Sequence, residues 1–95
     1  GEAQREELLA EALARTAYED LRIALRKAEL LRADLLPAGE TIFESAQSGY
    51  IGGKTSFAEF STAERYLVDL RLEMHEAQRD ANRAVLALAA VRGHF

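Results

Sequence analysis

The side chains that could do chemistry are few in this sequence and lie far apart. His75 stands between Met74 and Glu76, and a helix that binds a metal ion would need a second ligand three or four residues after the histidine. Those positions hold Gln78 and Arg79, and the guanidinium of Arg79 would repel a cation. The spacing of the remaining polar residues does not indicate the converging groups that catalysis requires. We therefore expect no metal, no cofactor and no enzymatic activity, and we interpret Met74 as a core residue.

Many of the acidic residues have an arginine at helical spacing. Opposite charges three residues apart lie on one face of a helix and stabilise it weakly. The formal net charge is −4, and the basic residues are mixed with the acidic ones rather than gathered on one face, which argues against nucleic-acid binding. We interpret these charges as a solvated face, with the acidic lining of a helical lumen as the alternative. The spacing predicts the pairs Glu19–Arg22, Glu29–Arg32, Glu76–Arg79 and Asp80–Arg83.

A glycine-rich segment near the middle of the chain interrupts the helical pattern of the two halves. Three of the six glycines fall within residues 48–55, and glycine readily adopts the left-handed backbone angles that end a helix. Apolar and hydrogen-bonding side chains stand together around these glycines, which is typical of a contact surface. We hypothesise a partner-binding tip, and the alternative is an ordinary loop whose aromatic side chains cover the end of a helix pair. The candidate tip residues are Tyr50, Ile51, Gly52, Gly53, Lys54, Thr55, Ser56 and Phe57.

A helix start follows the glycines directly. Ser56 and Glu59 match a capping box, in which the serine hydroxyl accepts from the Glu59 amide and the Glu59 side chain reaches back to the Ser56 amide. The sequence therefore predicts one helix over about residues 3–50, a tip turn over residues 50–56, and a second helix over about residues 57–92.

Apolar residues recur at alternating steps of three and four in both halves, which is the spacing of a coiled-coil seam. The chain is rich in Ala and Leu, has one Pro and lacks Cys and Trp, so the composition also favours long helices. We predict an all-α fold, a single long antiparallel two-helix coiled-coil hairpin. The second half supplies Phe60, Ala63, Leu67, Leu70, Met74, Ala77, Ala81, Ala84, Leu88, Val91 and Phe95, and the first half supplies Ala10, Ala14, Ala17, Leu21, Ala24, Ala28, Leu31, Leu35, Ala38 and Ile42.

A seam of alanines buries little apolar surface, because each square ångström removed from water contributes only about 25 cal/mol. Further apolar residues stand beside the seam, among them Leu8, Leu13, Leu25, Leu72 and Val85. We therefore expect the chain to self-associate or to belong to a larger α-helical barrel. No run of about 18 apolar residues is long enough to span a bilayer, and we expect the sequence to be a piece of a longer protein.

Pro37 conflicts with an uninterrupted first helix. It has no amide to donate to the Ala33 carbonyl, and inside a helix it costs roughly 3 kcal/mol. We expect a kink or a short break near residues 33–37, with the helix resuming at once, and we keep a functional hinge as an alternative to simple curvature.

The order of residues around the turn resembles the tip of the TolC-like outer-membrane efflux protein family, also called outer-membrane factors. In that family a tyrosine, two residues and a glycine precede a small polar, an apolar and an acidic residue and then an Ala-Gln-Arg-like run. Upstream, residues 35–37 followed by Glu40 resemble the stretch that precedes this tip, and residues 88–93 resemble the close of the last helix. Ala58 and Ser61 depart from the family, which more often has larger apolar residues there. The matching positions are Tyr50, Gly53, Ser56, Phe57, Glu59, Ala63, Glu64 and Arg65.

The resemblance implies the C-terminal periplasmic helical hairpin of a Gram-negative outer-membrane protein. In such a protein a homotrimer forms a β-barrel in the outer membrane and an α-helical tunnel across the periplasm. The tunnel tips meet the hairpin of a periplasmic adaptor protein, which connects them to an inner-membrane pump. The implied function is an efflux duct in a tripartite export system, with residues 52–57 contacting the adaptor. The transported compound stays open, since drugs, metal ions and other small molecules all fit.

Two alternatives belong to another class: the α-hairpin of the adaptor itself, also called a membrane fusion protein, and a generic coiled-coil scaffold. Adaptor tips resemble a helical turn with an Arg, a Leu and a Ser spaced around it, and that arrangement is not found near Gly53. The residues around the turn therefore favour the duct.

Overall fold

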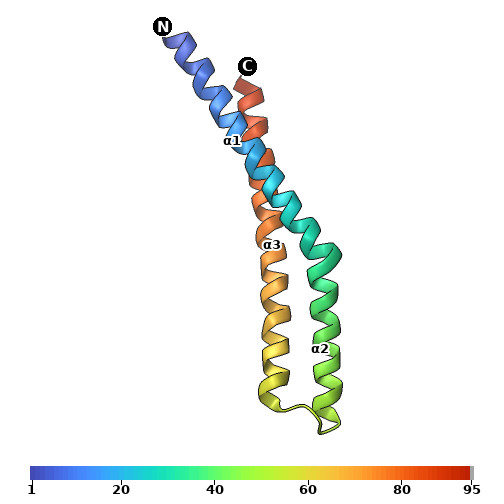
Figure 1. Ribbon diagram of the computed structural model, residues 1–95. Helices are drawn as coiled ribbons and strands as arrows, with labels where there is room; N and C mark the ends of the chain where they lie inside the picture. Colours follow the sequence, from blue (N-terminus) through green and yellow to red (C-terminus); the bar gives the residue numbers. More distant parts are fainter. Residues whose placement is uncertain (95) are drawn as a thin grey trace.

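The computed structural model describes residues 1–94 and shows an antiparallel hairpin of long helices (Figure 1). In chain order these are α1 (Glu2–Leu30), a π turn η1 (Leu31–Leu35), α2 (Leu36–Ile51) and α3 (Phe57–His94). The extents are 73 × 20 × 14 Å and the radius of gyration is 20.7 Å, against about 12 Å for a compact domain of this length. Over the described residues there is no strand, which confirms the predicted all-α hairpin.

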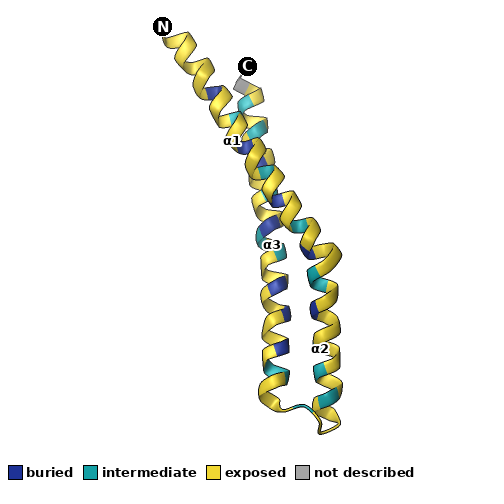
Figure 2. Ribbon diagram, viewed as in Figure 1, coloured by how far each residue is buried: buried dark blue, intermediate teal, exposed yellow. Residues whose placement is uncertain are grey.

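The contact between the two arms consists mostly of small side chains. The buried residues lie where the helices face one another (Figure 2), and Leu31, 1% exposed, is the largest fully buried one. From Phe60 to Val91 the predicted α3 seam is confirmed, because each of its members is buried or half-buried; Phe95 lies outside the described residues. The buried apolar set is Ala10, Ala17, Ala24, Leu31, Ala63, Leu67, Leu70, Ala77 and Ala84.

The π turn changes which face of the first arm meets α3. The Leu36 amide donates to the Leu31 carbonyl, five residues back instead of four. A π turn inserts one extra residue into the helix, so every later side chain is rotated by about 100° relative to a continuous α-helix with 3.6 residues per turn. The face that α2 presents to α3 is therefore shifted by one residue in the sequence.

The shift overturns two predicted seam positions. Ala38 and Ile42 are exposed, Ile42 by 49%. Gly39 is buried and Phe43 is half-buried in their place. The prediction of Ala38 and Ile42 as seam residues was wrong, because a regular spacing of three and four has no room for the extra residue of the π turn.

Pro37 gives the physical reason for the turn. In a continuous α-helix its ring would clash with the Ala33 carbonyl, whereas here it stands at the start of α2, just after the wider turn. The backbone stays helical through Leu35 and Leu36, with φ −73° and −64°, and the axis of the first arm bends at this level (Figure 1). The outcome is thus a bend with a π turn, without any non-helical residue.

Gly39 lies in close contact with α3. A Cβ atom added at this position would lie 2.7 Å from Leu70 Cδ1 and 3.5 Å from Leu67 Cδ1. The two leucines fill the space that a side chain at residue 39 would occupy, so a glycine there lets the helices pack.

Large apolar side chains remain on the surface of the rod. Leu8, Leu9 and Leu86 are 66%, 60% and 70% exposed, and Tyr18 and Ile23 are similar at 61% and 60%. None of the helices over the described residues is long and apolar enough to cross a membrane. The exposed apolar groups are therefore spread along a rod that is otherwise rich in charge.

The shifted register makes opposite predictions for two adjacent residues. Gly39→Leu forces a large side chain against Leu70 and should lower the free energy of unfolding by about 1–3 kcal/mol, as overpacked cores do. Ala38→Leu, on the exposed side, should change it by less than about 0.5 kcal/mol. Thermal unfolding followed by circular dichroism measures both, and a larger loss for Ala38→Leu than for Gly39→Leu would contradict the observed register.

Candidate functional site: the helical tip

The first arm ends in a Schellman motif built on Gly53. This residue has φ +76°, and it is the described residue whose backbone is left-handed. Its amide donates to the Tyr50 carbonyl over 3.1 Å, and the Lys54 amide donates to the Gly49 carbonyl over 2.7 Å. These two bonds satisfy carbonyls that the end of α2 would leave unpaired. The turn is therefore a defined structure.

The close approach of Thr55 leaves no room for a side chain at residue 49. The Thr55 amide also donates to the Gly49 carbonyl, over 3.0 Å. A Cβ atom added at Gly49 would collide with Thr55 Oγ1 and would lie 3.0 Å from Thr55 Cβ. Thr55 thus packs directly against the backbone of α2, and it is the half-buried member of the turn.

Ser56 begins α3. Its Oγ accepts a hydrogen bond of 3.1 Å from the Glu59 amide, and its carbonyl accepts from the Phe60 amide over 3.0 Å. The reciprocal bond from the Ser56 amide to the Glu59 carboxylate does not occur in the described structure, so the capping box is half formed. A serine at this position stabilises a helix start by about 1 kcal/mol relative to alanine.

Four aromatic rings pack together across the end of the hairpin. Tyr50 lies on Phe60 with ring centroids 5.2 Å apart and an angle of 10° between the planes. The ring centroid of Phe57 lies 5.8 Å from that of Tyr50, and the centroid of Phe43 lies 5.7 Å from that of Phe60; both pairs are tilted. Aromatic pairs at these separations contribute about 0.5–1.5 kcal/mol beyond the area they bury. The cluster joins α2 to α3 immediately behind the turn.

The predicted tip residues are brought together at the end of the rod, and all of them except the half-buried Thr55 are exposed. Ile51 is 79% exposed, Phe57 64% and Tyr50 43%. Gly52, Gly53, Lys54 and Ser56 are also exposed. Tyr50 and Phe57 therefore belong to the aromatic cluster and also contribute to the exposed surface of the tip.

Three residues of this site were missed as tip residues at the level of sequence. The sequence predicts Phe60 as a seam residue and Gly49 as a helix breaker. It does not distinguish Phe43 from the other apolar residues of the first arm. The spacing of Phe43, Tyr50 and Phe60 fits one aromatic cluster only once the π turn has moved Phe43 to the seam face.

The predicted ion pairs are formed in part. Arg22 bonds Glu19 at 2.8 Å and Arg32 bonds Glu29 at 2.7 Å. In each pair the hydrogen bond that the arginine donates to the carboxylate, followed by the charge of the carboxylate, raises the pKa of the arginine. Glu76–Arg79 and Asp80–Arg83 form no ion pair, so these two predictions were wrong. An exposed ion pair gains little energy beyond the side-chain entropy that it loses. Helical spacing alone therefore does not cause such a pair to form.

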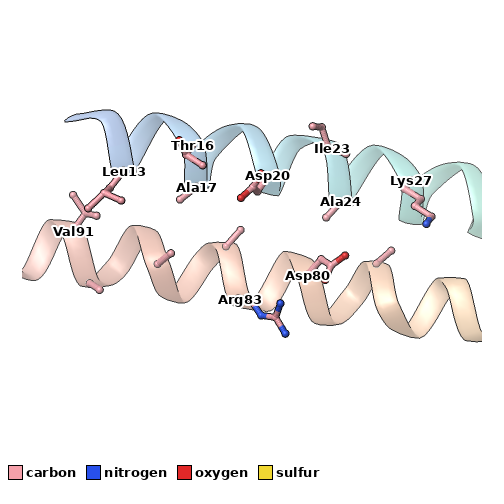
Figure 3. Close-up of a pocket in the computed structure, with 14 residues that line it drawn as sticks. Leu13, Thr16, Ala17, Asp20, Ile23, Ala24, Lys27, Asp80, Arg83 and Val91 are labelled. Carbon is pink, nitrogen blue, oxygen red and sulfur yellow. The ribbon is translucent and has the colours of Figure 1, made fainter. Parts of the chain in front are cut away.

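A shallow groove follows one side of the contact between α1 and α3 (Figure 3). Its main section has a volume of 670 Å³, and a second section of 430 Å³ continues it past Leu9 to Glu6. Leu13 and Val91 line both sections and lie opposite one another. The groove is thus an elongated apolar surface on the arm, well separated from the tip along the rod.

The described residues hold no group of three or more histidine, cysteine or carboxylate side chains close enough to bind a metal ion. Met74 is half-buried in the seam and His75 is exposed beside it. No protein-family model matches the chain, and no curated protein or solved structure is significantly similar to it.

The contact between Gly49 and Thr55 can be tested by a pair of substitutions. Gly49→Ala should destabilise the hairpin by about 1–3 kcal/mol, because the new methyl group meets the Thr55 side chain. Thr55→Gly removes that obstacle, so the double variant should lose less than the sum of the two single changes. Urea unfolding of all four chains gives the coupling energy, and strictly additive losses would show that the two residues do not limit each other.

Proposed function

We propose that this chain is a periplasmic tunnel segment of an outer-membrane efflux duct in a tripartite export system, and that its tip docks onto the hairpin of a periplasmic adaptor protein. Two findings support the proposal. The fold is a long α-helical hairpin, and the residues that resemble the outer-membrane efflux family gather at its exposed end. The chain then acts as part of a conduit and carries out no reaction.

The observation that carries the proposal is the exposure of apolar side chains on a fixed turn. Ile51 and Phe57 are 79% and 64% exposed, yet the backbone between them is held by the Schellman bonds and by the Ser56 cap. A surface that is already ordered loses little conformational entropy on binding. Exposed aromatic and aliphatic groups on such a surface are the usual anchors of protein interfaces.

The length and shape of the rod support the other part of the proposal, that the chain forms part of a tunnel wall. Its length of 73 Å carries the tip far from the opposite end, where α1 begins and α3 ends (Figure 1). In the full-length protein a homotrimer would supply further helices, and the apolar residues exposed on the arms would be covered by them. Tunnel walls of this kind need several hairpins side by side, because one hairpin encloses no channel.

Docking predicts a loss of transport when charge is placed on the tip. Ile51→Asp and Phe57→Asp in the full-length protein should each weaken adaptor binding by roughly tenfold or more, as expected for anchor residues worth about 2 kcal/mol, and should lower export accordingly. Export from cells and cross-linking to the adaptor measure the two effects.

The matched control is Gln78→Asp, which adds the same charge at an exposed position of α3 far from the tip. It should export like the parent protein. All three variants should form the same oligomer as the parent, so that a loss of export reports on docking. Unchanged adaptor binding in both tip variants would rule out the docking role.

A further inference from the structure

Two adjacent sets of residues on α2 have the character needed to pack against α3. The first set, the inner stripe, is buried or half-buried and consists of Gly39, Phe43 and Ala46. The second set, the outer stripe, is exposed and consists of Ala38, Ile42 and Ser45. Each residue of the outer stripe directly precedes one of the inner stripe and is likewise apolar or small. A rotation of α2 by one residue would therefore exchange one stripe for the other.

The outer stripe is the one that the spacing of the first arm favours. Alternating steps of four and three lead from the buried Leu31 through Leu35 to the outer stripe. Residues at this spacing share one face of an α-helix. An uninterrupted first arm would therefore turn the outer stripe toward α3. The inner stripe faces α3 only because the π turn adds one residue.

Pro37 is the residue that makes the uninterrupted helix unfavourable. In a continuous α-helix its ring would meet the Ala33 carbonyl. The π turn ends two residues before Pro37, which stands in the first turn of α2. Pro37 is itself exposed, so it does not hold the inner stripe in place by packing into the core. Its influence on the register is exerted through the backbone.

The choice of stripe also determines the aromatic cluster behind the turn. The rings of Phe43 and Tyr50 both pack on Phe60, and their centroids lie 5.7 Å and 5.2 Å from its centroid. Tyr50 lies about 20 Å along α2 from Pro37, at 1.5 Å per residue. A rotation of α2 by one residue, about 100°, would carry both rings away from Phe60 and bring Ile42 to the seam. The aromatic cluster therefore belongs to the inner-stripe register alone.

We propose that Pro37 is a positioning residue for the tip. It keeps the inner stripe against α3, and α2 of a chain that lacks it turns the outer stripe inward and separates Phe43 and Tyr50 from Phe60. The sequence thus encodes two registers of one hairpin, and a single proline selects the register that orders the tip. The link from this register to adaptor binding rests on the proposed docking role, whereas the register itself does not.

Tryptophan reporters test the register directly, because the chain has no tryptophan of its own. Phe43→Trp places an indole on the inner stripe, and Ile42→Trp places one on the outer stripe. With Pro37 present, the Phe43→Trp chain should emit at the shorter wavelength, since contact with water shifts indole emission to longer wavelengths. Adding Pro37→Ala to each chain should reverse this order.

The matched control is Glu40→Ala, which places the same residue at an exposed position of α2 and leaves Pro37 intact. It should leave the order of the two emission wavelengths unchanged. Circular dichroism shows whether each chain stays helical. The proposal is overturned if Pro37→Ala leaves the order unchanged, or if that substitution unfolds the hairpin.

The first residue of each stripe gives an independent test. With Pro37 present, Gly39→Leu meets Leu70 and should raise the equilibrium constant of unfolding roughly 5- to 150-fold, as overpacking does. In the Pro37→Ala background residue 39 turns away from α3, so the same substitution should change that constant by less than about threefold. Ala38→Leu should then be the more costly of the two. Urea unfolding measures these effects, and an equal cost of Gly39→Leu in both backgrounds would show that α2 has only one register.

Adaptor binding by the full-length protein separates this inference from the proposed function. Pro37→Ala should weaken cross-linking to the adaptor in the same direction as Ile51→Asp and Phe57→Asp. If the two aspartate variants lose binding and Pro37→Ala retains it, the tip docks but Pro37 does not position it. If all three variants retain binding, the docking role fails, and the fluorescence and urea measurements still decide the register.

Discussion

Pro37 has no amide to donate, and the geometry of the tip depends on how the first arm accommodates this. The helix inserts one residue at Leu31–Leu35, and this residue turns Gly39 and Phe43 toward α3. Gly39 permits the close approach to Leu70, and Phe43 reaches Phe60. Phe60 in turn stacks on Tyr50 at the end of α2. The π turn that accommodates Pro37 thus sets the position of Phe43, and through Phe60 it affects the packing of Tyr50 beside the turn.

The two parts of the rod are stabilised by different chemistry. Between α1 and α3 the buried residues are mainly alanines, which allow close backbone packing but remove little apolar area from water. Near the turn, four aromatic rings and the hydrogen bonds of the Schellman motif hold the arms together. The arms are therefore joined by larger side chains near the tip, and the alanine-rich part of the rod leaves an apolar groove on its surface.

Much of the fold could be predicted from sequence because the signals are local. The seam of α3 follows from its spacing, the start of α3 from Ser56, and the end of α2 from the glycines. The register of α2 could not be predicted, because Ile42 and Phe43 are both apolar and either could have filled the seam. Only the hydrogen bond from Leu36 to Leu31, five residues back, decides between them. The close contact of Gly49 with Thr55 likewise depends on the path of the turn in space.

The fold and the tip carry different information about function. Adaptor proteins, efflux ducts and simple coiled-coil scaffolds can all use a long antiparallel hairpin, so the fold alone does not distinguish among these functions. A scaffold needs only a turn that reverses the chain, and such a turn could be polar throughout. Here Ile51 and Phe57 project into solvent from a turn that the Tyr50 ring and the Ser56 cap already hold in place. Exposed apolar groups on an ordered turn suit contact with a partner, and this is the ground on which we propose the docking role of the tip.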